Sequence, residues 1–435
     1  DVSIRVITDH LRSVTFMIAD GVMPGNEGRG YVLRRLLRRA ARHGKLLGIK
    51  GSFLYDIAKE VAHVSGGAYP ELIEKQDYIQ KLIKIEEERF QETIDQGLNL
   101  LEMELDEVIK QEEKVFPGQG AFKLYDTYGF PFDLTKEIVE ERGLTVSLKE
   151  FEEAMEEQRQ RARKAREEAD NAVWTDDPFN PLGKEAVDTF VGYNQLESEG
   201  KIQGIIVDEH LADQAAAGDD VLVLLDRTSF YAESGGQVGD HGQIVHGDNV
   251  IDVTDCKKGS LNRHIHYGKV LSGNFKVGDS VTTKVNRELR EATQRNHTTT
   301  HLLQKALKMV LGDHVEQAGS FVSPTRLRFD FNHFQAMTEK EIKKVEKIVN
   351  QAILSAYDVN IFETNIDDAK KMGAMALFGE KYGEIVRVVK VGDFSIELCG
   401  GCHISNSAQV GMFKIIGESG VAAGIRRIEA TTGMN

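Results

Sequence analysis

Two short clusters of histidine and cysteine, far apart in the chain, constrain the fold of this 435-residue protein more than any other feature. The first is His297-Thr-Thr-Thr-His301, whose spacing on a helix places two imidazoles on one face, about one turn apart. The second is Cys399-Gly-Gly-Cys402-His403, where the glycines allow the backbone to bend so that a thiolate and an imidazole converge. Because imidazole and thiolate together form a typical zinc ligand set, the chain is predicted to fold so that the two clusters share one ion.

The predicted site holds one Zn²⁺ per chain, with the ligands His297, His301, Cys399 and His403. Cys402 is an alternative ligand to Cys399, which is preferred because it repeats the four-residue spacing to His403. The helix lacks the glutamate of an HExxH motif, so a metalloprotease is not predicted. No GxxxxGK[ST] loop and no GxGxxG turn after a strand occurs, so phosphate-transfer and dinucleotide-binding functions have no support.

The composition limits the cellular compartment and the kinds of partner that are expected for the chain. Only 3 cysteines are present, too few for a disulfide scaffold, which indicates a reducing, cytoplasmic compartment. No apolar stretch is long enough to predict a membrane span. The net charge of −15 argues against a chain coated with nucleic acid along its whole length, although it leaves room for a local basic patch.

Periodicity divides the chain into three regions, and the predicted fold is multi-domain. Residues 1–182 are predicted to be an all-α helical domain, ending in a highly charged connector helix over 148–171. Frequent glycines and short β-type runs then predict a small β-barrel over 183–286. Residues 287–435 mix both patterns and are predicted to form an α+β domain, in which Thr338 and Glu341 make a capping box.

A basic helix is predicted from Gly30 to Gly44. One face carries leucine and alanine, and no acidic residue occurs between Gly28 and Lys50. The opposite face is a stripe of five arginines: Arg34, Arg35, Arg38, Arg39 and Arg42. Because solvated helix faces usually mix charges of both signs, this stripe predicts contacts with nucleic-acid phosphates. Near the end of the chain, Arg426 and Arg427 are also candidates for phosphate contacts, and strand alternation leaves one of them, assigned as Arg426, facing outward.

Several longer motifs, in this order, resemble the alanyl-tRNA synthetase family over nearly the whole chain. The segments that carry the resemblance are 29–44, 124–134, 230–240, 295–303, 377–383 and 397–403. One departure is Cys402, since the family usually has Cys-Gly-Gly-Thr-His at this place, and a second thiolate could compete for the metal.

The resemblance implies a helical tRNA-recognition region that binds the acceptor stem of alanine tRNA at a G·U wobble pair. The residues similar to the family's base-reading pair are Asn26 and Asp126, with Asp133 as an alternative to Asp126. An amide and a carboxylate suit the hydrogen-bonding edges of bases.

The resemblance also implies an editing region that hydrolyses alanine tRNA mischarged with serine or glycine at its 3′ end. Thr300 and Gln317 match residues of the editing pocket, and Gln317 matches one implicated in serine selection. Two roles for zinc stay open, activation of water or positioning of the substrate, and a full set of four protein ligands favours positioning. A tRNA 2′-hydroxyl or a bound water is expected to serve as the base.

The resemblance further implies that an amino-acid-activating, ATP-binding domain precedes residue 1 and that an oligomerisation segment follows Asn435. No class II adenylate-forming motif is recognised in the sequence, so the chain is not expected to aminoacylate by itself. Two other hypotheses remain: a free-standing deacylase or threonyl-type editing module, and a structural zinc module on a tRNA-binding scaffold.

Overall fold

The computed structural model describes residues 2–25, 28–169, 177–375, 383–422 and 424–433, with the side chains of α8 described up to residue 160. The chain divides into two compact units, Asp1–Val173 and Trp174–Asn435. Among the described residues, no helix combines the length and the apolar character needed to cross a bilayer.

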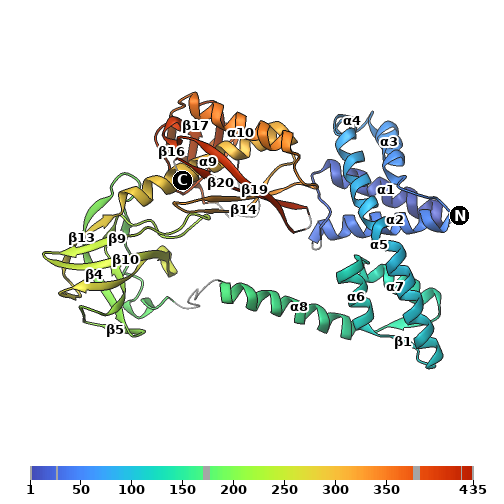
Figure 1. Cartoon of the computed structure of the whole chain (residues 1–435), viewed down its shortest axis with the longest axis horizontal. Helices are drawn as coiled ribbons and strands as arrows, with labels where there is room; N and C mark the ends of the chain where they lie inside the picture. Colours follow the sequence, from blue (N-terminus) through green and yellow to red (C-terminus); the bar gives the residue numbers. More distant parts are fainter. Residues whose placement is uncertain (1, 26–27, 170–176, 376–382, 423, 434–435) are drawn as a thin grey trace. The chain divides into compact units, whose positions relative to one another are not determined.

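The first unit is built mainly from helices (Figure 1). In chain order they are α1 (Val2–Ala19), α2 (Gly28–Leu46), α3 (Leu54–Ser65), α4 (Glu71–Glu74), α5 (Gln76–Lys110), α6 (Gly118–Tyr128), α7 (Phe132–Glu141) and α8 (Leu148–Ala169). The unit differs from the all-α prediction by one small parallel pair, β1 (Val115–Phe116) with β2 (Thr145–Val146). This pair joins the segment before α6 to the segment before α8, where two residues per strand leave no periodic signal in the sequence.

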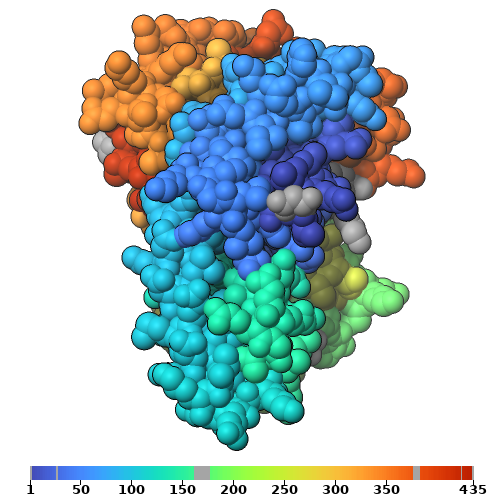
Figure 2. All heavy atoms as spheres, turned by 90° about the vertical axis from the view of Figure 1, so that its right-hand side faces the viewer, coloured from blue at the N-terminus to red at the C-terminus, as the bar shows by residue number. Residues whose placement is uncertain are grey.

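Apolar stripes hold this helical unit together. On α1, Ile7, Leu11, Val14 and Ile18 are buried at helical spacing. On α2, Leu33 and Leu37 are buried in the same manner, and α5 packs against both α2 and α3. The atoms of this unit, blue at α1 to blue-green at α8 in the space-filling view, form a continuous surface (Figure 2).

The second unit begins with the predicted β-barrel. Six strands close into a ring in the order β13–β9–β10–β11–β7–β4, with β13 pairing back to β4. Their bounds are β4 (Glu197–Val207), β7 (Asp220–Leu225), β9 (Gly242–His246), β10 (Asn249–Lys258), β11 (His264–Ser272) and β13 (Ser280–Val285). Alternating inward side chains such as Ile205, Val223 and Ile251 fill its interior. The same region contains five shorter strands outside the ring. They are β3 (Thr189–Phe190), β5 (His210–Ala212), β6 (Gln214–Ala216), β8 (Arg227–Thr228) and β12 (Asn274–Lys276).

The long helix α9 (Arg287–Leu311) follows the last barrel strand and runs into the α+β part (Figure 1). It begins ten residues before the predicted start at His297, with Asn286 as its N-cap. Its first turns bury polar residues, including Arg290, which forms an ion pair with Asp240 of the barrel. The predicted start at His297 relied on apolar residues at helical spacing, and a helix segment that buries polar groups does not show that spacing.

The α+β part has two antiparallel sheets. One has the order β14–β15–β20–β19 and the other β16–β17–β18. The bounds are β14 (Gln317–Val322), β15 (Leu327–Asn332), α10 (Glu339–Leu354), β16 (Val359–Asn365), α11 (Ile366–Lys371), β17 (Ile385–Val391), β18 (Ser395–Leu398), β19 (Phe413–Ala422) and β20 (Ile425–Thr432). The predicted capping box of Thr338 and Glu341 is confirmed at the start of α10.

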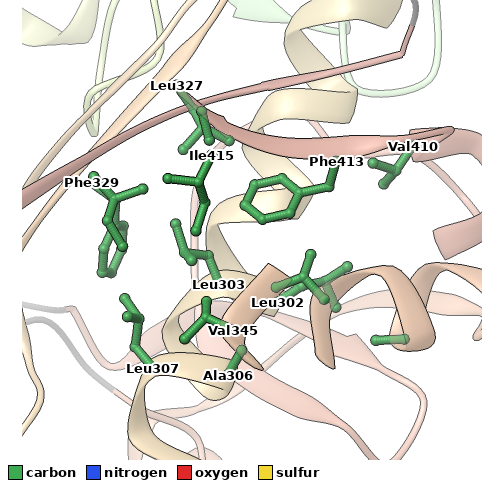
Figure 3. Close-up of a cluster of buried hydrophobic side chains, with 14 of the residues drawn as sticks. Leu302, Leu303, Ala306, Leu307, Leu327, Phe329, Val345, Val410, Phe413 and Ile415 are labelled. Carbon is green, nitrogen blue, oxygen red and sulfur yellow. The ribbon is translucent and has the colours of Figure 1, made fainter. Parts of the chain in front are cut away.

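A shared hydrophobic core fixes α9 and α10 against the four-stranded sheet (Figure 3). Leu303 and Leu307 of α9 meet Leu327 and Phe329 of β15, with Val345 contributed by α10. Burying an apolar side chain of this size stabilises the fold by roughly 1.5–3 kcal/mol. The core therefore sets the position of α9, and with it the direction in which the helix presents its polar face.

Candidate functional site

The predicted metal ligands converge at one place. His297 and His301 lie one turn apart on α9, with their rings stacked at a centroid distance of 5.8 Å. Cys399 and His403 lie in the loop that follows β18. One side-chain donor atom from each of the four residues lies within 4.8 Å of all the others. The Cys399 sulfur is 3.4 Å from His297 Nε2 and 3.3 Å from His403 Nε2.

Each imidazole of the cluster is held through its other ring nitrogen, Nδ1. His297 Nδ1 is 2.6 Å from Gln237 Oε1, and His403 Nδ1 is 3.1 Å from Thr298 Oγ1. His301 Nδ1 makes a short contact with a carboxylate oxygen of Glu397. Polar groups that orient the outer nitrogen of a ligating histidine are typical of metal sites.

These residues suit a metal cation. The Nε2 atom of His301 is buried and has no hydrogen-bond partner among the described residues, as expected of an atom that points to an ion. Three imidazole nitrogens and one sulfur, all within 4.8 Å of one another, form a donor set suited to Zn²⁺. His297, His301 and His403 are each less than 10% exposed, so water would compete little with a bound ion.

The electrostatics of the cluster favour a thiolate. Burial alone would raise the pKa of the Cys399 thiol, but the imidazoles of His297 and His403, whose Nε2 atoms lie 3.4 and 3.3 Å from the sulfur, outweigh burial and bring it well below its usual value. Burial lowers the pKa of His403 to about 3, which keeps this imidazole neutral and able to ligate. His301 differs, because the Glu397 carboxylate outweighs burial and raises its pKa to about 10.

Cys402, the alternative ligand, lies apart from the donor cluster. The group of converging donor atoms contains the Cys399 sulfur and does not contain that of Cys402. Cys402 is buried, its backbone N–H donates to Gln237 Oε1 at 2.9 Å, and burial raises the pKa of its thiol to about 11. In this geometry Cys402 anchors the loop through its backbone, while Cys399 faces the histidines.

Two further side chains hold the loop between the cysteines. The Arg387 guanidinium donates to the carbonyl oxygens of Cys399 and Gly401 at 2.9 and 2.7 Å. Tyr193, from the barrel side, donates its hydroxyl to the carbonyl of Gly400 at 2.7 Å, and its ring packs under Arg387. A Cβ at Gly401 would collide with the ring of His297, so glycine is required here for close approach.

A cavity of about 150 Å³ opens beside the cluster. Both predicted pocket residues, Thr300 of α9 and Gln317 of β14, line it together with three of the cluster residues. The buried Thr300 hydroxyl donates to the carbonyl of His297 at 2.7 Å, so its oxygen lone pairs remain available as acceptors. Further lining residues are Gly235, Gln304, Lys308, Glu316, Ser320, Met375, Glu397 and Leu398.

In the helical unit the structure differs from the prediction of an open basic face. Arg34 and Arg42 are buried, at 8% and 5% exposure. All five arginines pair with acidic residues of other helices: Arg34 and Arg38 with Glu86, Arg35 with Asp133, Arg39 with Glu137, and Arg42 with Glu141. The helix itself contains no acid, but α5 and α7 supply them from 48 to 99 residues further along the chain. Arg35 and Arg39 keep the greatest side-chain exposure, 45% and 36%.

The remaining predicted contact residues are scattered. Asn26 lies outside the described residues. Asp126 is exposed, accepts a hydrogen bond from Gln158 of α8 at 2.6 Å, and lines a cavity of about 290 Å³ that Arg34 and Arg38 also reach. In the second unit, Arg426 pairs with Glu418 and is largely covered, with 18% of its side chain exposed, and Arg427 pairs with Asp330.

Sequence reasoning missed the residues that orient the imidazoles. Thr298 and Glu397 stand beside ligands in the chain, so their polarity next to a metal motif was a usable signal. Gln237 lies within the segment 230–240, which carries part of the family resemblance, but nothing in its spacing connects it to His297. Nothing in the sequence connected Arg387 with the metal cluster, because an arginine in a strand is ordinarily exposed to solvent.

The chain matches two known families. Residues 1–289 match the family described as tRNA synthetases class II (A), and residues 386–429 match the Threonyl and Alanyl tRNA synthetase second additional domain. The first match disagrees with the expectation that the class II region lies wholly outside the chain. That expectation relied on the absence of a recognisable short motif, which is weak evidence over a region of this length.

Several proteins with similar sequences are each named alanine–tRNA ligase. The chain is 56% identical over 433 residues to the alanine–tRNA ligase of Alkaliphilus metalliredigens, and 56% identical over 434 residues to that of Clostridioides difficile. It is 54% identical over 434 residues to the alanine–tRNA ligase of Thermoanaerobacter sp.. Each of these alignments covers 100% of this chain and 49% of the relative, so the chain spans about half the length of these proteins.

Proposed function

The chain belongs to the alanyl-tRNA synthetase family of class II tRNA synthetases, and from this we propose that it binds alanine tRNA and hydrolyses the ester when that tRNA wrongly carries serine or glycine. The observation that carries the proposal is the placement of four converging metal donors beside a cavity lined by Thr300 and Gln317. A donor set that only stabilised the fold would not need a cavity at its edge.

The need for a hydrolytic site follows from the chemistry of small amino acids. A pocket that fits alanine rejects serine, which only adds a hydroxyl, by roughly a hundredfold. Glycine is smaller and enters the same pocket. A second site that binds the serine hydroxyl specifically can remove the mistakes, because alanine offers nothing to pair with the polar groups there.

We propose one zinc ion per chain, held by His297, His301, Cys399 and His403. When bound, zinc supplies a Lewis-acid centre that polarises or orients groups next to it. Four protein ligands would satisfy the usual coordination number of zinc, which would favour positioning of the ester over generation of a free hydroxide. The attacking water would then be activated by a tRNA 2′-hydroxyl or by a second bound water.

The residues around the cavity have distinct proposed roles. Because the Thr300 hydroxyl donates its proton to a helix carbonyl, it can accept a hydrogen bond from the hydroxyl of a serine substrate. Gln317, on β14, presents an amide that can both donate and accept. Glu316 adds a negative charge at the cavity, which suits the positively charged amine of an aminoacyl ester.

In the helical unit, the proposed tRNA contacts divide by exposure. Arg35 and Arg39 are exposed enough to reach phosphates of the acceptor stem. Arg34, Arg38 and Arg42 are committed to acids, and we propose that they hold the helices in place rather than bind phosphates directly. Asp126, exposed beside them, remains the proposed base-contacting carboxylate, with Asn26 as its partner.

The direct test is a deacylation assay with zinc present, comparing alanine tRNA charged with serine, glycine or alanine. We expect release of serine and glycine and retention of alanine. Thr300→Val, nearly isosteric with threonine, should slow serine release selectively, because it removes the proposed acceptor. Thr299→Val is the matched control, since Thr299 also donates to a helix carbonyl, at 2.7 Å, but does not line the cavity. Equal hydrolysis of all three esters would refute the proposal.

A ligase assay with ATP, alanine and alanine tRNA addresses the other half of the family activity. The expectation that this chain does not aminoacylate by itself stays a prediction, and the class II match over residues 1–289 gives a specific reason to measure it. Formation of alanyl-tRNA by the chain would overturn that expectation without affecting the proposed hydrolysis.

A further inference from the structure

One glutamine of the β-barrel reaches the metal cluster. Gln237 lies in the segment between β8 and β9, and its side chain is completely buried. Its Oε1 atom is 2.6 Å from His297 Nδ1 and 2.9 Å from the backbone nitrogen of Cys402. A single oxygen atom from the barrel thus contacts both the helix and the loop that supply the metal donors.

The contacts of Gln237 determine which way its amide points. The backbone N–H of Cys402 can only donate, so the atom that faces it must be the amide oxygen and not the amide nitrogen. The same oxygen then faces His297 Nδ1, and two groups meeting an acceptor must both be donors. His297 therefore carries its proton on Nδ1, which leaves the lone pair on Nε2, the atom nearest the Cys399 sulfur.

The barrel segment that carries Gln237 is held rigidly. Val238 N donates to Val322 O at 3.0 Å, and Val322 N donates to Gly236 O at 2.7 Å, so the segment is joined to the end of β14. A tight turn adds a hydrogen bond from Gln237 N to Ser234 O at 3.0 Å. The amide nitrogen Nε2 has no partner among the described residues, so the side chain acts through its oxygen.

We propose that Gln237 is a positioning residue of the metal centre, which holds His297 in the tautomer that can bind a metal and fixes the loop that carries Cys399. The barrel is then part of the centre, and not only a spacer before α9. The inference rests on the proposed metal site. It assigns to Gln237 a role toward the metal, whichever ester the site hydrolyses.

Metal affinity is the quantity that tests this role. Zinc affinity of the full chain would be measured by competition with a chromophoric chelator, and the cobalt-substituted protein would report the thiolate and imidazole ligands through its visible absorption. Gln237→Met keeps the length of the side chain but removes the acceptor. Loss of a group that orients a ligand lowers metal affinity by about 10–100-fold, and we expect a loss in that range.

A conservative variant separates positioning from bulk packing. Gln237→Glu keeps an acceptor oxygen for both donors, so its zinc affinity should stay within about threefold of the parent, well short of the 10–100-fold loss. Gln203→Met is the matched control, a glutamine-to-methionine change in barrel strand β4 whose amide donates to Val187 O, away from the cluster.

The outcomes are distinct. Unchanged zinc affinity in Gln237→Met, or an equal loss in Gln237→Glu and Gln237→Met, would overturn the role. If Gln237→Met fails to fold, Gln237→Asn replaces it, since the shorter amide cannot meet both donors and should again weaken zinc binding. Zinc binding without ester hydrolysis by the parent chain would refute the proposed function and leave this inference standing.

Discussion

The arginine helix α2 and the histidine face of α9 present similar patterns in the sequence, yet their side chains have different surroundings. Both helices place ionisable side chains along one face. On α2, every arginine of the stripe meets a carboxylate from α5 or α7. On α9, the partners Gln237 and Glu397 occupy one nitrogen of each histidine, and the other nitrogen faces the cluster.

The difference shows what a partner does to a functional side chain. A guanidinium that is neutralised and buried has lost most of its attraction for a phosphate, because its charge is already compensated. An imidazole held through Nδ1 gains in ligand strength at Nε2, because the partner fixes its orientation and tautomer. On α2, the partner carboxylates thus leave part of the arginine stripe unable to bind phosphate. On α9, the partner groups orient the histidines so that they can bind a metal.

The largest expected effect tests the α9 side of this comparison. His301→Ala removes one of four donors. Structural zinc sites bind with roughly 10–16 kcal/mol, so one of four ligands accounts for about 2.5–4 kcal/mol and its loss should weaken zinc binding by about 100- to 1,000-fold. Chelator competition measures the affinity, and seryl-tRNA hydrolysis should fall in parallel.

Cys256→Ala is the control for that experiment, because Cys256 is a buried thiol of the barrel that does not belong to the donor cluster. Its zinc affinity should equal that of the parent. Retention of parental affinity by His301→Ala would break the comparison, since zinc would then be bound without His301.

The second prediction tests the α2 side. Glu86 is buried at 3% exposure and pairs with both Arg34 and Arg38. Glu86→Gln would remove the carboxylate charge that two covered guanidinium groups share, which should lower the free energy of unfolding of the helical unit by about 3 kcal/mol. Hydrogen exchange of α2 and α5 peptides measures this locally. Unchanged protection would mean that these arginines are not committed to internal pairing.

Glu87, next to Glu86 on α5, is a buried carboxylate whose effect on stability should depend on pH. The Glu87 carboxylate is buried and accepts backbone N–H groups of Phe53 and Leu54 at 3.0 Å each. Burial raises its pKa from 4.5 to about 7, with the hydrogen bonds only partly opposing the shift. The folded state thus holds the proton more tightly than the unfolded state, so this contribution to stability is complete below about pH 4.5 and is lost as the pH rises through about 7.

Glu87→Gln should therefore match the parent at low pH and exceed it at pH 8 by about 2 kcal/mol, after allowance for solvent screening. The measurement is the difference in protection of α3 and α5 amides between parent and variant across that range. A constant difference at all pH values would show that the carboxylate does not titrate in the folded state.

Sequence patterns predicted local features of this protein and failed where the decisive contact joins distant segments. The His297–His301 pair, the capping box of Thr338 and the alternation of Leu327, Phe329 and Phe331 all depend on neighbours within a few residues. The partners of the arginine stripe lie on other helices, and Gln237 lies on a barrel segment, so no local spacing could connect them. The inward face of α9 before His297 was missed because it buries Arg290 and Asn296 rather than apolar groups.

The smallest expected effect tests whether Arg35 of α2 has a binding role. Arg35 forms a pair with Asp133 in which both side chains are about half exposed, so Arg35→Ala should change stability by no more than about 1 kcal/mol. If Arg35 contacts a phosphate, the variant should bind alanine tRNA more weakly at every salt concentration, and the slope of log affinity against log salt should decrease by about 1. Arg42→Ala is the matched control: Arg42 is buried and paired with Glu141, so its loss should lower stability without changing the salt slope. An unchanged slope in Arg35→Ala would remove Arg35 from the proposed phosphate contacts and leave Arg39 as the remaining exposed candidate of the stripe.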